Sequence, residues 1–156
     1  MLTRDQLDDI QNTYNPPEDS KLGIALQRAY EHLDRLEAVR QVTGENEGRR
    51  RRADGFLSAV RNHQVPVTTD NLAESVRKAL EDQQVATVLR ATAETQLQTA
   101  TSNYNNAATT VNGIAVALRG AKSPGKVAHV RQKYLNEKPP AGLLDRAKRR
   151  VRAAAV

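Results

Sequence analysis

The sequence predicts an all-α protein, an elongated and coiled-coil-like helical bundle organised on one long alanine-rich helix at about residues 70–118. A heptad rhythm is the main reason, because steps of four and three residues run without interruption from Leu72 to Leu118. This alternation places the side chains along one seam of an α-helix. The predicted packing seam consists of Leu72, Val76, Ala79, Ala86, Ala93, Leu97, Ala100, Tyr104, Ala107, Val111, Ile114 and Leu118.

The composition of the chain limits how much apolar surface the bundle can bury by itself. Only 38% of the residues are hydrophobic and 3% are aromatic, and the chain has no cysteine. Apolar burial contributes about 25 cal/mol per Å², whereas ordering the backbone costs about 1–2 kcal/mol per residue. A core of alanine, leucine and valine is therefore thin, and we expect self-association or a protein partner to supply part of the buried surface. The missing cysteines exclude disulfide scaffolds and thiolate metal sites.

Charge is distributed unevenly along the chain. Residues 1–47 hold 5 basic and 10 acidic residues, a net charge of −5, whereas residues 119–156 hold 11 and 2, a net charge of +9. The segment between them carries only +2. Such polarity suits head-to-tail contacts between copies, or a tail that meets phosphate or an acidic surface. A solvated tail is an equally good interpretation.

Local signals predict two helices in the first third of the chain. A capping-box pattern at Thr3 and Gln6 predicts a first helix that ends at about Tyr14. The sequence Asn-Pro-Pro at residues 15–17 ends it, because proline lacks an amide donor and disfavours helix in the residue before it. Apolar residues at helical spacing predict the second helix at residues 20–43.

The sequence Gly-Glu-Asn-Glu-Gly at residues 44–48 predicts a turn. A third helix would then run from Arg49 to His63 and would begin with four arginines. Cations are unfavourable at a helix N-terminus. The run therefore indicates either contact with an external acidic partner or a solvated charge cluster. The candidate contact residues are Arg49, Arg50, Arg51 and Arg52.

The long helix contains one internal conflict. Threonine and asparagine, which are weak helix formers, crowd residues 99–113, and helix propensity alone predicts a break near residues 102–106. The heptad seam nevertheless continues through this stretch at Ala100, Tyr104 and Ala107. A turn has no reason to preserve heptad phase, so we expect an unbroken helix.

Two seam positions are polar, Gln83 and Arg90. Polar residues at coiled-coil core positions reduce stability and specify register or partner. We therefore expect both side chains to be buried and to have this role. Larger apolar residues beside them widen the apolar face, so this half of the helix is expected to contact two neighbours. These residues are Leu80, Val85, Val88 and Leu89.

The sequence predicts a basic arm in the last part of the chain. Ser123 followed by Pro124 predicts a helix start, and this helix should end at about Asn136. After a Pro-Pro pair, about residues 141–155 form a basic amphipathic pattern. The candidate contacts of this segment with phosphate or an acidic partner are Arg146, Lys148, Arg149, Arg150 and Arg152.

The chain is accordingly divided into two parts. Residues 1–120 are expected to form the helical bundle with its long central helix, and residues 121–156 a basic helical C-terminal arm. No apolar run has the length of a membrane span, and the N-terminus lacks the pattern of a classical signal peptide. We therefore expect a soluble protein in the cytoplasm or within a virion or other large particle.

No motif for catalysis or for metal or cofactor binding is found in the sequence. His32, His63 and His129 are isolated, without a partner at metal-ligand spacing. No serine lies in a G-x-S-x-G elbow, and no glycine-rich loop has phosphate-binding spacing. We therefore expect neither an enzyme nor a cofactor, a metal or a small-molecule substrate.

These features together predict a non-enzymatic structural or assembly protein, a helical interaction module of a homo-oligomer or of a larger particle such as a phage virion. The alternative is a nucleic-acid-binding accessory protein whose basic arm contacts phosphates without reading the base sequence. An excess of 17 arginines over 7 lysines favours phosphate contact. The lack of an aromatic stacking platform argues against single-strand binding.

Overall fold

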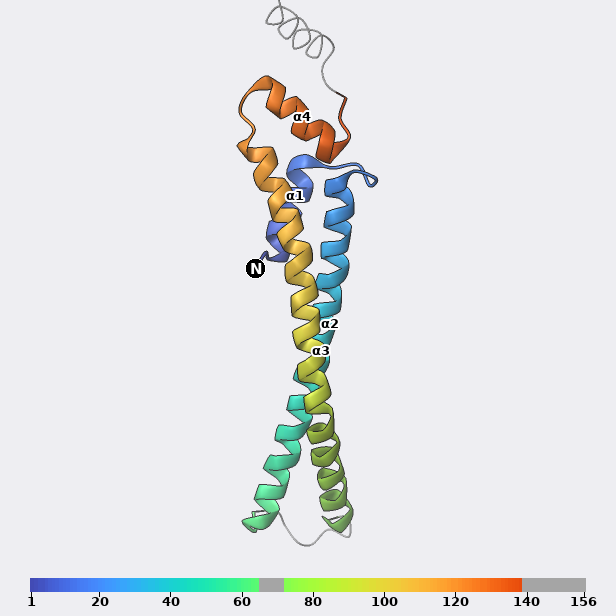
Figure 1. Ribbon diagram of the computed structural model, residues 1–156. Coiled ribbons are helices and arrows are strands. Elements are labelled where there is room, and N and C mark those ends of the chain that lie inside the picture. Colours follow the sequence, from blue (N-terminus) through green and yellow to red (C-terminus); the bar gives the residue numbers. More distant parts are fainter. Residues whose placement is uncertain (65–71, 139–156) are drawn as a thin grey trace, which may run out of the picture. The chain divides into compact units, whose positions relative to one another are not determined.

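The computed structural model describes residues 1–64 and 72–138, which are almost entirely helical (Figure 1). Within these ranges there are four helices and no strand: α1 (Arg4–Tyr14), α2 (Lys21–Arg61), α3 (Leu72–Gly120) and α4 (Pro124–Leu135). The predicted all-α fold, organised on one long alanine-rich helix, is confirmed. Two compact units share α2 and α3: unit 1 consists of Met1–Leu33 and the described residues from Asn103 onward, and unit 2 consists of the described residues between Asp34 and Ser102.

Unit 1 contains α1, α4, the first part of α2 and the last part of α3. Its core includes several large, fully buried side chains. The Tyr104 hydroxyl also donates a hydrogen bond to the carbonyl oxygen of Leu2, which ties the N-terminal segment to α3. The buried apolar residues of this unit are Leu7, Ile10, Leu22, Ala25, Leu26, Ala29, Leu33, Tyr104, Ala108, Val111, Ile114, Ala115, Leu118 and Leu135.

The two short helices begin where the sequence predicts. At α1 the Thr3 hydroxyl accepts the Gln6 N–H at 3.2 Å, and the Gln6 side chain accepts the Thr3 N–H at 2.8 Å. At α4 the Ser123 hydroxyl accepts the Lys126 N–H at 3.3 Å, and proline occupies the first turn. Both caps satisfy amides that have no partner inside the helix, which is why these local signals suffice.

The start of α2 depends on one glycine. Ser20 is fully buried, and its hydroxyl donates to the Pro17 carbonyl oxygen at 2.6 Å and accepts the Gly23 N–H at 3.0 Å. A Cβ atom at Gly23 would lie 2.0 Å from the same Pro17 oxygen. The backbone can approach this closely only because residue 23 has no side chain.

The predicted turn at residues 44–48 and the separate helix from Arg49 to His63 are wrong, because α2 continues unbroken to Arg61. Each glycine in a helix costs about 1 kcal/mol relative to alanine. Contacts with α3 offset this cost: the Asn46 amide donates to the carbonyl oxygen of Ala86 at 3.2 Å. The four arginines thus lie inside a helix, and the argument from the helix dipole does not apply to them.

The helix α3 is continuous through residues 102–106, as predicted. Threonine hydroxyls in this region bond back to carbonyls four residues earlier, for example Thr101 to Leu97 at 2.7 Å and Thr109 to Asn105 at 2.7 Å. These bonds let a weak helix former satisfy its own hydroxyl without leaving the helix. Burial of Tyr104 on the seam then outweighs the poor local propensity.

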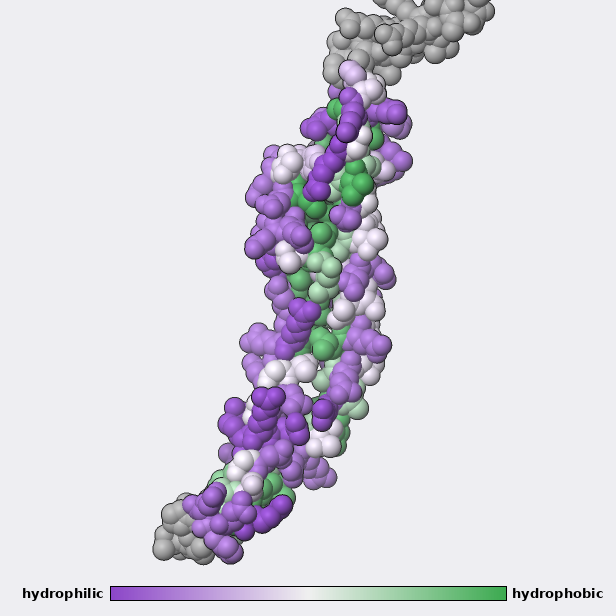
Figure 2. Space-filling model, turned by 90° about the vertical axis from the view of Figure 1, so that its left-hand side faces the viewer, coloured by the Kyte–Doolittle hydropathy of each residue, from purple (hydrophilic) through white to green (hydrophobic). Residues whose placement is uncertain are grey.

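Unit 2 consists of the remaining parts of α2 and α3, which lie side by side in opposite directions (Figure 1). Among its described residues the buried apolar ones are one leucine and four alanines: Leu36, Ala53, Ala79, Ala86 and Ala100. This core is thinner than that of unit 1. On the face drawn in Figure 2, polar side chains cover most of the surface and apolar side chains emerge between them as a narrow band.

The predicted amphipathic helix at about 141–155 lies outside the described residues. Its candidate contact residues, Arg146, Lys148, Arg149, Arg150 and Arg152, lie there as well.

Candidate interaction surfaces

The polar seam residues contact α2 in unit 2. The Gln83 amide is half-buried and donates to the Asp54 carboxylate at 2.6 Å. Arg90 lies 3.6 Å from Glu47 and 3.5 Å from Glu94. The expected burial of Arg90 is wrong, since its side chain is 54% exposed. Its long stem reaches the acidic groups from the edge of the seam, which keeps the guanidinium in water.

The other seam positions differ in burial. Ala79, Ala86, Ala100, Tyr104, Val111, Ile114 and Leu118 are buried. The half-buried seam positions are Leu72, Val76, Ala93, Leu97 and Ala107. The seam is therefore turned toward other parts of the protein, and in unit 2 it is turned mainly toward α2.

Four large apolar side chains of unit 2 remain exposed on α3 and form what we call the apolar surface of α3. Their exposed fractions are 51% for Leu80, 45% for Val85, 68% for Val88 and 46% for Leu89. At about 100° per residue, Val88 lies on the side of the helix opposite the seam, with the other three on its flanks. Between Asp82 and Glu94 the one charged residue is Arg90, at a seam position. The outward side of α3 is therefore uncharged over about three turns.

The arginine run lies in the middle of α2. Arg50 pairs with Glu47 at 3.0 Å and with Asp54 at 3.5 Å, so its charge is compensated within α2. The side chains of Arg49, Arg51 and Arg52 are exposed. The structure thus separates one arginine that is paired within α2 from three whose side chains are exposed, a distinction the sequence alone does not make.

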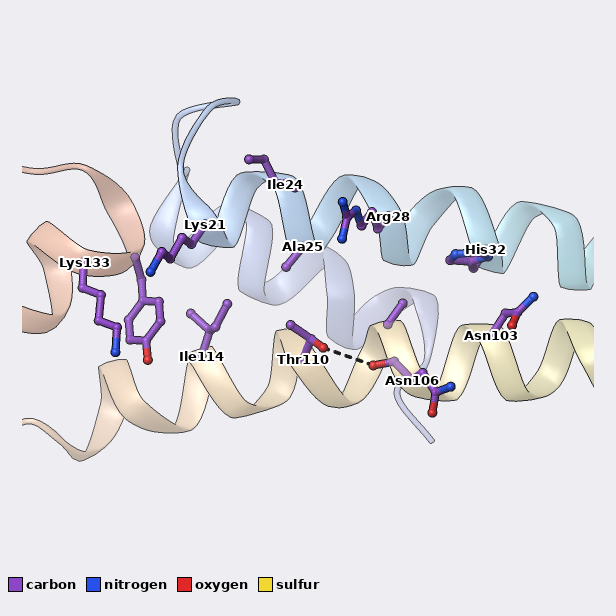
Figure 3. Close-up of a pocket in the computed structure, with 12 residues that line it drawn as sticks. Lys21, Ile24, Ala25, Arg28, His32, Asn103, Asn106, Thr110, Ile114 and Lys133 are labelled. Carbon is purple, nitrogen blue, oxygen red and sulfur yellow. Dashed lines mark hydrogen bonds between the residues drawn. The ribbon is translucent and has the colours of Figure 1, made fainter.

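Unit 1 contains a groove of about 720 Å³ between α2, α3 and α4, which we call the basic groove (Figure 3). Figure 3 shows Lys21 and Lys133 toward its α4 end, His32 at the opposite end, and Arg28 between them. Short apolar side chains and amides complete the lining. The lining residues are Lys21, Ile24, Ala25, Arg28, His32, Asn103, Asn106, Ala107, Thr110, Ile114, Lys133 and Tyr134.

The lining of the basic groove contains no carboxylate. Lys133 instead lies 5.2 Å from the centroid of the Tyr134 ring, within the range of a cation–π contact. The nearby carboxylate of Glu137 is engaged elsewhere, because it accepts two hydrogen bonds from Arg131 at 2.7 and 2.8 Å. These bonds lower the pKa of Glu137. The groove therefore presents uncompensated positive charge over an apolar floor.

Sequence reasoning did not find this groove. The cations come from α2 and α4, which are about one hundred residues apart in the chain, and each one alone resembles a solvated surface residue. The available signal was the spacing on α2, where Lys21 and Arg28 are seven residues apart and His32 follows four residues later. This spacing places the three side chains near one face of the helix.

Comparison with known proteins adds no assignment: the chain matches no family model, curated protein or solved structure. Among residues 1–64 and 72–138, no helix is long and apolar enough to cross a membrane. The same residues hold no cluster of three or more metal-ligating side chains. The fold and the surfaces described above define the class of the protein, an all-α helical bundle.

Proposed function

We propose that this protein is a non-enzymatic assembly protein, a helical interaction module that associates with further copies of itself through the apolar surface of α3. The observation that carries the proposal is the exposure of Leu80, Val85, Val88 and Leu89 on a helix whose opposite side already packs on α2. Large apolar side chains exposed on the outer side of a packed helix offer area that a further helix can cover. A second copy of the chain would cover these side chains of α3.

Two properties of unit 2 support this pairing. Its core is built largely from alanine, so an isolated pair of helices buries little apolar area. Residues 34–102 also hold ten basic and ten acidic residues, a net charge of zero in a chain of net charge +6. Two copies can therefore meet at unit 2 without the like-charge repulsion that the basic C-terminal part would create. Incorporation into a larger particle, such as a phage virion, is the natural extension of this proposal.

Sedimentation velocity over a range of protein concentrations tests the proposal. The chain should associate, and Val88→Glu should weaken association at least about tenfold, since a buried charge without a partner costs well over 1.4 kcal/mol. Val116→Glu is the matched control, because Val116 is also an exposed valine of α3 but lies in unit 1. A monomeric wild-type chain, or equal effects of the two substitutions, would contradict the proposal.

A second candidate function is sequence-independent nucleic-acid binding. It is supported by the exposed arginines Arg49, Arg51 and Arg52 on α2 and by the basic composition of residues 139–156. Removal of residues 139–156 should abolish duplex binding at low salt without changing the helix content of the remainder. A full-length chain that ignores both DNA and RNA at low salt would rule this function out.

A further inference from the structure

We propose that the basic groove of unit 1 binds an acidic amphipathic helix of a partner protein. The groove goes beyond the proposed self-association, because none of its lining residues belongs to the apolar surface of α3. Three features of the groove support this inference: its charge, its length and the size of the side chains at its floor.

The charge of the groove selects a negatively charged occupant. Four basic side chains line it, Lys21, Arg28, His32 and Lys133, and none of its lining residues is acidic. No ion pair joins these four to a carboxylate within residues 1–64 and 72–138. A carboxylate-rich partner would supply the missing charges and would be steered toward the groove from solution.

The length and floor of the groove favour a helix over a compact anion. Lys21 and His32 are eleven residues apart on α2, which corresponds to about 16 Å at 1.5 Å per residue. The basic side chains are thus spread along three helical turns and do not converge on one phosphate group. The floor includes Ala25, Ala107 and Ile114, and small side chains allow the backbone of a docked helix to approach closely. A nucleic-acid backbone would leave this apolar floor uncovered.

The chain itself is a poor source of this helix. The segment at residues 139–156 holds five basic residues against one acidic residue, so the groove repels it. In a second copy, α1 carries the exposed acids Asp5, Asp8 and Asp9, but its exposed side chains are all polar. It therefore lacks the apolar ridge that the floor requires. A different protein with glutamate or aspartate beside an i, i+3, i+4, i+7 apolar stripe fits both features.

Fluorescence anisotropy with a labelled synthetic peptide tests the inference. The probe is a 14-residue helix with leucines at i, i+3, i+4, i+7 and i+11 and mainly glutamate elsewhere. One control peptide has the same composition with scrambled leucines, and a second has lysine in place of glutamate. The full-length chain should bind the probe at least about tenfold more tightly than either control, a difference of about 1.4 kcal/mol.

Two charge reversals on α2 locate the binding site. Arg28→Glu should weaken probe binding about tenfold or more, because it places a carboxylate in the middle of the groove. Arg35→Glu is the matched control, since Arg35 is exposed one heptad further along the same helix and does not line the groove. It should change binding less than about twofold, as expected for a screened distant charge. Both residues are exposed, so neither substitution disturbs a core.

Four results would overturn the inference. If the scrambled peptide binds as tightly as the probe, binding depends only on charge attraction and not on an apolar stripe. Equal effects of the Arg28 and Arg35 substitutions would place the site outside the groove. Tighter, Arg28-dependent binding of duplex DNA or RNA would assign the groove to phosphate. Displacement of the probe by excess Arg28→Glu chain, which retains every other surface, would identify a second copy as the occupant.

Discussion

The amide of Gln83 on α3 donates a 2.6 Å hydrogen bond to the carboxylate of Asp54 on α2. Asp54 lies 29 residues earlier in the chain, and the bond occurs where both neighbouring core positions, Ala79 and Ala86, are alanines. Alanines alone fix a helix register weakly, because one methyl group fits almost any position opposite. We therefore expect the polar pair to specify how α2 and α3 align in unit 2.

A double-mutant cycle measures this contribution. Gln83→Ala and Asp54→Ala should each lower the free energy of unfolding, and together they should lower it by less than the sum. The coupling energy should be about 0.5–1.5 kcal/mol, typical of a hydrogen bond that is partly buried. Urea denaturation of the four proteins supplies the values. Additive effects, with no coupling beyond error, would mean that the bond does not hold the register.

The glycines of α2 should respond to alanine in opposite directions. Gly44 lies in the helix interior with open space where a Cβ atom would be, so Gly44→Ala should raise the free energy of unfolding by about 0.5–1 kcal/mol. Gly23→Ala should lower it, because the new Cβ would lie 2.0 Å from the Pro17 carbonyl oxygen. Thermal unfolding measures both changes. If Gly44→Ala lowers the free energy of unfolding, that result would contradict a continuous helix here and favour the turn that the sequence predicts at residues 44–48.

Helix boundaries could be predicted from the sequence where the signal is local, but not where contacts with another helix decide the outcome. The caps at Thr3 and Ser123 were predictable because each acts within one helical turn. The same local logic fails at residues 44–48, where glycine normally indicates a turn but contacts with α3 keep the chain helical. Seam continuity through residues 102–106 was predictable because the heptad phase already encodes that packing.

Surface features were harder to predict than the helices. The apolar surface of α3 could be identified from Leu80, Val85, Val88 and Leu89, since they flank a recognisable seam. The basic groove could not, because it forms only when α4 returns to α2 and α3. The burial of Arg90 was predicted wrongly for a related reason. A seam position does not by itself bury a long side chain whose guanidinium can extend to nearby carboxylates.

Tyr30 should make the stability of the protein sensitive to high pH. Burial raises the pKa of Tyr30, and the Asp8 carboxylate, which accepts its hydrogen bond at 2.5 Å, raises it further. In the unfolded chain the pKa of tyrosine is about 10. The stability linked to neutral Tyr30 is thus fully present below pH of about 10 and is lost as the pH rises beyond it.

Unfolding in urea at a series of alkaline pH values checks this dependence. Tyr30→Phe should flatten the decline in stability above pH of about 10, because no phenol remains to ionise at this position. Asp8→Asn should flatten it partly, since burial continues to act on Tyr30. An unchanged slope in Tyr30→Phe would show that another group is responsible.

The most direct test of the proposed assembly function is whether the apolar surface of α3 becomes covered when copies meet. The chain has no cysteine, so Val88→Cys and the exposed control Gln98→Cys each introduce a single thiol. Their reaction rates with a thiol reagent are compared across the concentrations over which sedimentation shows association. The account predicts that Val88→Cys reacts severalfold more slowly in the associated state while Gln98→Cys keeps its rate. Equal rates for Val88→Cys in dilute and associated protein would contradict it.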